Sequence, residues 1–145
     1  MNKMSEIAIS GQKVEVNATI EEGAVIGPRA YVGMDAFIGR GAVIEAVARI
    51  EAGAVIEAGA VIAERALIEA GARIEAGARI EAGARIEAGA MIGAGAVIAE
   101  RAVIEAGAVI AEGVVIRAGA RIAERWFRKM LIAEKWTPVK QEQGK

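Results

Sequence analysis

A six-residue unit, Ile-Glu-Ala-Gly-Ala-Arg, dominates the middle of the chain. It occurs three times in succession over residues 68–85 and returns once more with Met91 in its last place. Followed outward, every sixth residue from Val14 to Ile122 is Ile or Val, without a break in register. A period of six matches neither the 3.6-residue period of an amphipathic helix nor the period of two of an open strand. The repeat therefore indicates a chain that closes on itself at regular intervals.

Each repeat divides into a short strand and a corner. The residue two positions before each central Ile or Val is Ala from Ala18 to Ala108. On an extended strand, residues two apart face the same way, so we expect this large and small apolar pair to point inward. Three positions after each central residue the chain mostly carries Gly, which adopts positive φ at little steric cost. One hexad is therefore one strand followed by one turn.

This order of an aliphatic residue, a small or acidic residue, two variable residues, a small residue and one variable residue resembles the hexapeptide-repeat, left-handed parallel β-helix family. The resemblance covers residues 14–122. It implies that three hexads form one triangular coil, so that roughly six coils stack about 4.8 Å apart. The expected fold class is all-β, a left-handed triangular parallel β-helix (solenoid) with a C-terminal α-helix.

The segments that flank the repeats complete a four-part organisation. We expect residues 1–13 to form an N-terminal cap on the first coil and residues 14–122 to form the β-helix. Residues 123–137 lack Gly and Pro and place apolar side chains four apart, as at Trp126 and Met130, which indicates a helix. Pro138 ends that helix, and residues 138–145 form a polar tail.

Composition excludes several classes of function. The chain has no Cys, which removes disulfides, thiol nucleophiles and thiolate metal sites, and its net charge of −1 argues against a nucleic-acid partner. No apolar run approaches a membrane span, so we expect no membrane partner. The first ten residues lack the apolar core of a signal peptide. The compartment stays unknown, with the cytoplasm expected if the chain is expressed in a cell.

The sequence between residues 49 and 121 is nearly monotonous. It uses almost only Ala, Gly, Glu, Arg, Ile and Val. Proteins of the family that the repeat resembles carry insertions and polar corner residues. We therefore expect a designed or consensus-idealised member.

Sorting the outward residues by an 18-residue coil isolates one apolar face. The outward residue of its strands is Val in every coil except one, which has Arg79. An exposed Val stripe is unusual for a monomer, although Val also simply favours strands. The family resemblance implies a parallel homotrimer, and a monomer whose C-terminal helix covers the face is the alternative. The candidate oligomer face comprises Val25, Val43, Val61, Val97, Val115, Ile132 and Trp136.

The corner after this apolar face departs from Gly. Arg29, Arg65 and Arg101 recur there at 36-residue spacing, two coils or about 9–10 Å apart. Guanidinium groups bind phosphates well, so this row is a weak candidate anion site. A solvated edge balanced by the neighbouring Glu64 and Glu100 is the interpretation that the sequence alone favours.

The resemblance implies two enzyme classes, acyltransferases that use CoA or acyl-carrier thioesters and zinc carbonic anhydrases of the gamma type. Both depend on histidine, and the sequence has none. A three-His zinc site is therefore excluded, and the imidazole base of the acyltransferases is missing. Rows of Glu such as Glu51, Glu69 and Glu87 are interpreted as solvated ladders with Arg49 and Arg85 between them.

These observations lead to a prediction of a non-catalytic structural β-solenoid, an idealised scaffold that self-assembles. We assign no catalytic, cofactor-binding or metal-binding residue, expect no cofactor, and expect the chain not to be an enzyme. Its expected partner is a second copy of itself. Two alternatives stay open: an acyltransferase-like enzyme of the hexapeptide-repeat family with a remodelled site, and an anion-binding module along the Arg corner.

Overall fold

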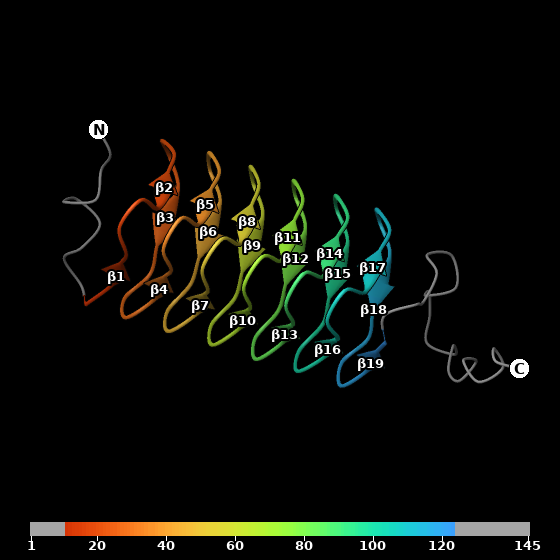
Figure 1. Ribbon diagram of the computed structural model, residues 1–145. Coiled ribbons are helices and arrows are strands. Elements are labelled where there is room, and N and C mark those ends of the chain that lie inside the picture. The colour runs from red at the N-terminus through yellow and green to blue at the C-terminus, as the bar shows by residue number, and fades with distance from the viewer. Residues whose placement is uncertain (1–10, 124–145) are drawn as a thin grey trace, which may run out of the picture.

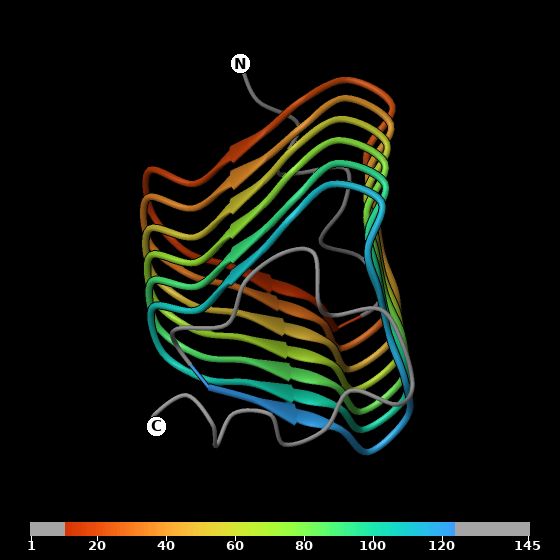
Figure 2. The ribbon, with the colours of Figure 1, turned by 90° about the vertical axis from the view of Figure 1, so that its right-hand side faces the viewer.

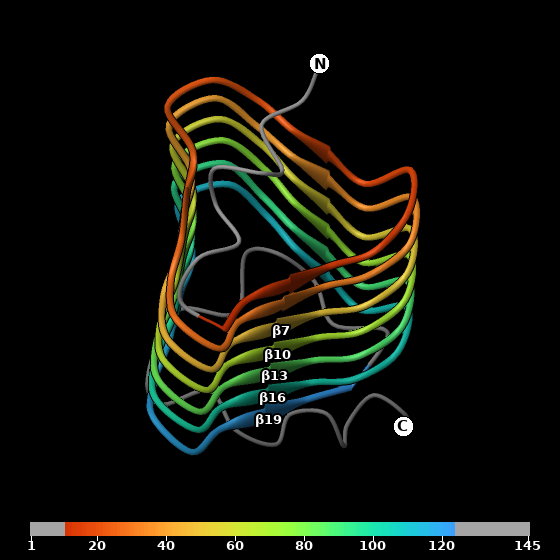
Figure 3. The same ribbon diagram turned by 90° about the vertical axis from the view of Figure 1, so that its left-hand side faces the viewer.

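The computed structural model describes residues 11–123, which form a parallel β-solenoid of about six coils. Figure 1 shows the coils in chain order, and Figures 2 and 3 show their three sides from opposite ends. The described residues form no α-helix, so none of their segments is a helix able to cross a membrane. Most of the expected cap (1–13) and of the expected helix (123–137), with Ile132 and Trp136, lies outside the described residues.

Within residues 11–123, nineteen two-residue strands make up three parallel sheets. The first sheet contains β1 (Lys13–Val14), β4 (Tyr31–Val32), β7 (Arg49–Ile50), β10 (Leu67–Ile68), β13 (Arg85–Ile86), β16 (Val103–Ile104) and β19 (Arg121–Ile122). The second contains β2 (Thr19–Ile20), β5 (Phe37–Ile38), β8 (Val55–Ile56), β11 (Arg73–Ile74), β14 (Met91–Ile92) and β17 (Val109–Ile110). The third contains β3 (Val25–Ile26), β6 (Val43–Ile44), β9 (Val61–Ile62), β12 (Arg79–Ile80), β15 (Val97–Ile98) and β18 (Val115–Ile116).

The register of the sheets follows directly from the 18-residue coil. Each strand pairs with the strand three places along the chain, so Ile68 lies beside Ile50 on one side and Ile86 on the other. Identical positions of successive coils therefore stack on each other. This stacking converts the sequence period into continuous rows of like side chains along the solenoid.

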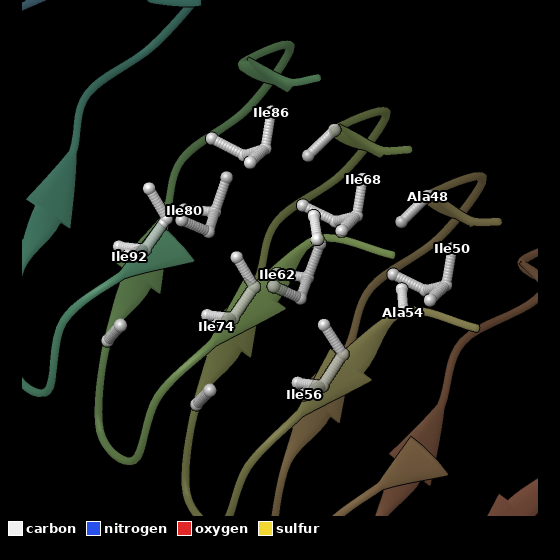
Figure 4. Packing of buried hydrophobic residues seen from close by; sticks show 14 of the residues in the cluster. Ala48, Ile50, Ala54, Ile56, Ile62, Ile68, Ile74, Ile80, Ile86 and Ile92 are labelled. Carbon is white, nitrogen blue, oxygen red and sulfur yellow. The ribbon is translucent and has the colours of Figure 1, made fainter. Parts of the chain in front are cut away.

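The interior consists of the two apolar rows expected from the sequence. The Ile or Val at the second position of every strand from β4 to β16 is 0% exposed, and the Ala two positions before it is also buried. Figure 4 shows Ile50, Ile68 and Ile86 stacked in successive coils, with Ile56, Ile74 and Ile92 stacked in the neighbouring sheet. Full burial of one such side chain contributes about 1.5–3 kcal/mol. Among the described residues no polar or charged residue is buried, so their charged groups lie at the outer surface of the solenoid.

Corners turn the chain between sheets and also join the coils. In a typical corner Gly71 has a φ of 73°, and the N–H of Ala72 donates to the carbonyl of Glu69 at 3.2 Å. Positive φ at the third residue of such a four-residue turn is where Gly has the least steric strain. The N–H of Gly71 donates to the carbonyl of Ala52 in the preceding coil at 3.1 Å. Corner amides therefore extend the backbone ladder of the sheets.

Six corners hold a residue other than Gly in the same left-handed conformation. Asn17 and Asp35 are residue types that tolerate it, because their short polar side chains bond locally. The corner after the third sheet, which we call the third corner, instead carries larger side chains at positive φ. These residues are Arg29 (63°), Val47 (64°), Arg65 (61°) and Arg101 (56°).

Candidate functional site

The third sheet presents the apolar stripe expected from the sequence, but not as a uniform surface. Its end residues Val25 and Val115 are 52% and 53% exposed, whereas Val43, Val61 and Val97 in between are half-buried. Arg79 in β12 interrupts the row. The candidate oligomer face is thus apolar at five described positions with one cation near its middle.

A recess of about 240 Å³ lies beside this cation. It is lined by Glu45, Val61, Ala63, Arg79, Ile80, Glu81, Ala82 and Glu100. The recess arises in the row formed by the residue that directly follows each strand of the third sheet. In this row Ala63 lies between Glu45 of the preceding coil and Glu81 of the next. The methyl group of Ala63 leaves unfilled the space that a Glu side chain takes up in other coils. The recess therefore combines a small apolar floor with three carboxylates and one guanidinium group.

Each Arg in the strands forms an ion pair with a Glu, and the residue in the preceding coil decides which Glu it is. Where the preceding coil offers a Glu beside the Arg, the shortest pair runs across the coils: Arg73–Glu57 at 3.0 Å, Arg85–Glu69 at 3.2 Å and Arg121–Glu105 at 2.8 Å. Arg85 also lies 3.8 Å from Glu87 of its own coil. Where the preceding coil offers no Glu, the Arg turns to the Glu of its own coil. Arg49 and Arg79 do so because Gly33 and Ala63 occupy the corresponding places. All these pairs are exposed and contribute about 0–1 kcal/mol each.

Arg79 has the longest of these contacts, since its Nε lies 3.9 Å from Oε2 of Glu81. Glu45 and Glu100 make no ion pair with any residue between 11 and 123. Both are exposed, and Glu81 is half-buried. The recess thus offers a loosely held cation and two carboxylates whose oxygens are available to an outside group.

A second cluster surrounds Tyr31 at the start of the first sheet. The guanidinium carbon of Arg49 lies 4.9 Å from the centroid of the Tyr31 ring, a cation–π distance. Burial raises the pKa of the Tyr31 phenol above its usual value, and the nearby carboxylates of Glu15 and Glu51 add to this, while Arg49 opposes it. The phenol is therefore held in its neutral form. We assign this cluster to local packing, because Arg49 is already occupied by Glu51 at 2.8 Å.

At the third corner, Arg29, Arg65 and Arg101 lie in one row along an edge of the solenoid and are exposed. The structure thus brings these three predicted site residues together, at the spacing of two coils. Within the described part of the chain none of them has a carboxylate within ion-pair distance, although Glu64 and Glu100 precede two of them.

The described residues contain no group of three or more acidic side chains arranged to hold a metal ion. The Glu ladders do not form such a group because adjacent carboxylates are a full coil apart and Arg side chains lie between several of them.

Part of the solenoid matches a known protein family. Residues 65–100 match the family described as bacterial transferase hexapeptide (six repeats). Residues 65–100 therefore resemble the repeats of this family. The match includes Arg79, Glu81 and Glu100 of the recess, and it supports the left-handed form of the hexapeptide-repeat solenoid. Comparison with curated protein sequences finds no significant match.

Solved structures extend the likeness of the hexapeptide-repeat chain beyond the matched segment. A hexapeptide transferase family protein from Anaplasma phagocytophilum is 25% identical with a TM-score of 0.73, over 78% of this chain and 70% of that one. A histidine-to-alanine mutant of GDP-perosamine N-acetyl transferase from Caulobacter crescentus, solved with CoA and GDP-perosamine, is 21% identical with a TM-score of 0.71, over 73% of this chain and 50% of that one. The acetyltransferase domain of PglB from Neisseria gonorrhoeae, solved with acetyl coenzyme A, is 23% identical with a TM-score of 0.57, over 79% and 52%.

These findings correct two predictions made from the sequence, that the protein is a non-catalytic scaffold and that it is not an enzyme. Residues 65–100 match a transferase family, and the Anaplasma neighbour is described as a hexapeptide transferase family protein, which supports the acyltransferase-like alternative instead. Both predictions had been drawn from the absence of histidine. An ionised carboxylate is also a proton acceptor, and the surface of the third sheet carries several.

The recess was not predicted from the sequence. Its signal was present in the alternation Glu45, Ala63, Glu81, Ala99, the residues that follow successive strands of the third sheet. A small residue between two acidic ones in a stacked row marks a place where the surface is hollow. The prediction of an idealised sequence is not tested by these comparisons.

Proposed function

We propose that this chain is an acyltransferase-like enzyme of the hexapeptide-repeat type, which moves an acyl group from a CoA thioester to an amine or hydroxyl group. The observation that carries the proposal is the match of residues 65–100 to the transferase hexapeptide family, together with the similarity of most of the chain to the Anaplasma transferase-family protein. The relatives solved with CoA or acetyl coenzyme A support the class of donor.

We place the acceptor at the recess of the third sheet. Three of its four charged residues, Arg79, Glu81 and Glu100, lie inside the matched segment. The apolar floor formed by Val61 and Ala63 excludes water from one side of a bound group. In a chain without His or Cys, the carboxylates are the groups at this recess that accept a proton at neutral pH.

The reaction then proceeds as follows. Glu45 or Glu100 accepts the proton from the acceptor N–H or O–H as its nitrogen or oxygen attacks the carbonyl carbon of the thioester. Arg79 donates a hydrogen bond to the oxyanion of the tetrahedral adduct, since its contact with Glu81 is long enough to yield. The carbon–sulfur bond breaks, and the departing thiolate takes the proton from the carboxylic acid. We expect slow turnover, because a carboxylate is a weaker base than imidazole.

We further propose that the active assembly is a homotrimer of parallel solenoids with the third sheet at the subunit contact. The two exposed ends of the stripe, Val25 and Val115, and the half-buried Val61 and Val97 between them support an apolar contact. Cyclic symmetry buries such a face in every copy. A second copy would also deepen the recess, which by itself is open to solvent.

The test of the chemistry is release of free CoA from acetyl-CoA in the presence of amino-sugar nucleotides and simple amines. We expect turnover that depends on the acceptor and falls at least about tenfold in a Glu45→Gln, Glu100→Gln double variant, which removes both bases. Glu75→Gln is the matched control, because Glu75 in the second sheet also makes no ion pair among the described residues and lies away from the recess. No acceptor-dependent release across the panel would refute the proposal.

The test of the assembly is the mass in solution. We expect a trimer that dissociates when Val61→Lys and Val97→Lys place like charges at its centre. A mass of one chain for the unmodified protein would contradict the trimer, and a trimer that survives both substitutions would show that a different face is used.

A further inference from the structure

We propose that the third corner is a binding edge for a linear polyanion, with Arg29, Arg65 and Arg101 as its contacts. This inference does not rest on acyl transfer. It rests on the conformation, the pairing and the spacing of three side chains along one edge of the solenoid.

The first observation is backbone strain. All three residues have a φ between 56° and 63°, in the left-handed region where a side chain costs about 1–2 kcal/mol relative to the right-handed one. The same corner holds relaxed Gly at Gly83 and Gly119, so the fold does not need Arg there. Strain that the fold does not require points to a role outside folding.

The second observation is the absence of carboxylate partners. Every Arg in the strands of the described residues lies within 4.0 Å of a Glu, namely Arg49, Arg73, Arg79, Arg85 and Arg121. The three corner Arg have no such contact within residues 11–123. Their N–H groups remain available to an external acceptor.

The third observation is the direction of the side chains. Cγ of Arg101 lies 3.5 Å from the point where a Cβ would stand on Gly83, one coil earlier, and Arg29 has the same relation to Gly11. Both arms therefore lie over the corner of the preceding coil. At these two positions the side chain therefore begins toward the preceding coil, along the edge and not away from it.

The backbone of this corner cannot supply the binding itself. The N–H of Arg65 already donates to the carbonyl of Ala46 at 3.2 Å, and that of Arg101 to Ala82 at 3.0 Å. Corner amides in left-handed turns often form anion-binding concavities, but here the ladder between coils uses them. Binding must therefore come from the side chains, which makes it sensitive to their substitution.

The spacing selects the ligand. Successive Arg are two coils apart, about 9.6 Å, so the row spans about 19 Å. A single phosphate or pyrophosphate reaches one Arg, and Glu64 and Glu100 weaken the local field. An extended chain of negative groups reaches all three at once, and linked contacts multiply affinity. The geometry thus favours a long polyanion over a small anion.

The experiment is calorimetric titration of the whole chain at physiological salt with long-chain inorganic polyphosphate and, separately, with pyrophosphate. We expect saturable binding of the long chain and at least about tenfold weaker binding of pyrophosphate. The Arg65→Gln, Arg101→Gln variant should lose at least about tenfold in affinity for the long chain. The matched control is Arg73→Gln, Arg85→Gln, which removes the same charge from the sheets and should change affinity by less than about threefold.

A further variant separates binding from structure. Arg65→Gly, Arg101→Gly relieves the strained φ, so we expect it to be more stable to denaturant and yet to lose binding. Absence of saturable heat with the long polyphosphate would overturn the proposal. Equal losses in the corner and sheet variants, or equal affinity for pyrophosphate, would also overturn it, because either result indicates attraction to net charge alone.

Discussion

The interior rows and the third corner obey different rules, although both repeat with the coil. Inside, the central residue is Ile or Val in every strand and is fully buried through the middle of the solenoid, because its volume must fit the same space each time. At the third corner the backbone has the positive φ that favours Gly, yet four of the corners carry Arg29, Val47, Arg65 and Arg101. Uniform residues thus mark the positions that carry the fold, and departures from the locally best residue mark positions free for another role.

The largest effect that separates the two regions should come from an interior deletion. Ile74→Ala removes a side chain that is 0% exposed, between Ile56 and Ile92 in the same sheet. We expect it to lower the free energy of unfolding by about 2–5 kcal/mol, since the coils above and below cannot close the cavity. Denaturant unfolding followed by circular dichroism measures this. Arg73→Ala, the exposed neighbour, is the control, and a loss below about 1 kcal/mol at Ile74 would contradict the comparison.

A smaller effect of opposite sign should come from the third corner. Val47 has a φ of 64° and is β-branched, a combination that is strongly disfavoured. Val47→Gly should raise the free energy of unfolding by about 1 kcal/mol, after part of the relief is offset by the greater freedom of Gly in the unfolded chain.

The reverse substitution tests the same idea at a relaxed corner. Gly71 has a φ of 73° and open space where a Cβ would stand, so Gly71→Val should cost about 1–2 kcal/mol through the backbone alone. If Val47→Gly proves destabilising by the same denaturant measurement, the corner is held by side-chain packing and not by φ.

The smallest effect should be a dependence on alkaline pH. The pKa of Tyr31 is raised in the folded protein, so the neutral phenol favours folding. That contribution is complete below the ordinary tyrosine pKa of about 10 and is lost as the pH rises through the higher folded value. Unfolding midpoints of the parent chain should therefore fall more steeply above about pH 10 than those of Tyr31→Phe. Parallel curves would mean that neither burial nor the carboxylates of Glu15 and Glu51 raise the pKa of the phenol in the folded protein.

Ion pairing shows where prediction from the sequence stopped. The period predicts two carboxylates near Arg73: Glu75, two residues later in the same coil, and Glu57, in the preceding coil. Nothing in the sequence indicates which of the two forms the ion pair. The structure selects Glu57, 16 residues away, at 3.0 Å. The general rule, that the preceding coil is preferred, emerged only from the stacked geometry. Arg49 and Arg79 are its exceptions, because Gly33 and Ala63 stand where the preferred carboxylate would be.

The sequence alone determined the strand-and-turn unit and the buried rows, because one large and one small apolar residue recur two apart with an unbroken period of six. The three-hexad coil and its parallel stacking were implied by the resemblance to the hexapeptide-repeat family, and the structure shows both. The tertiary structure decided what the outer surface does with the remaining residues. It set Arg29, Arg65 and Arg101 at positive φ without carboxylate partners among the described residues, and it left the space beside Ala63 unfilled. The same burial recurs in every coil, whereas ion pairing depends on which side chain the neighbouring coil presents, and a single repeat does not contain that information.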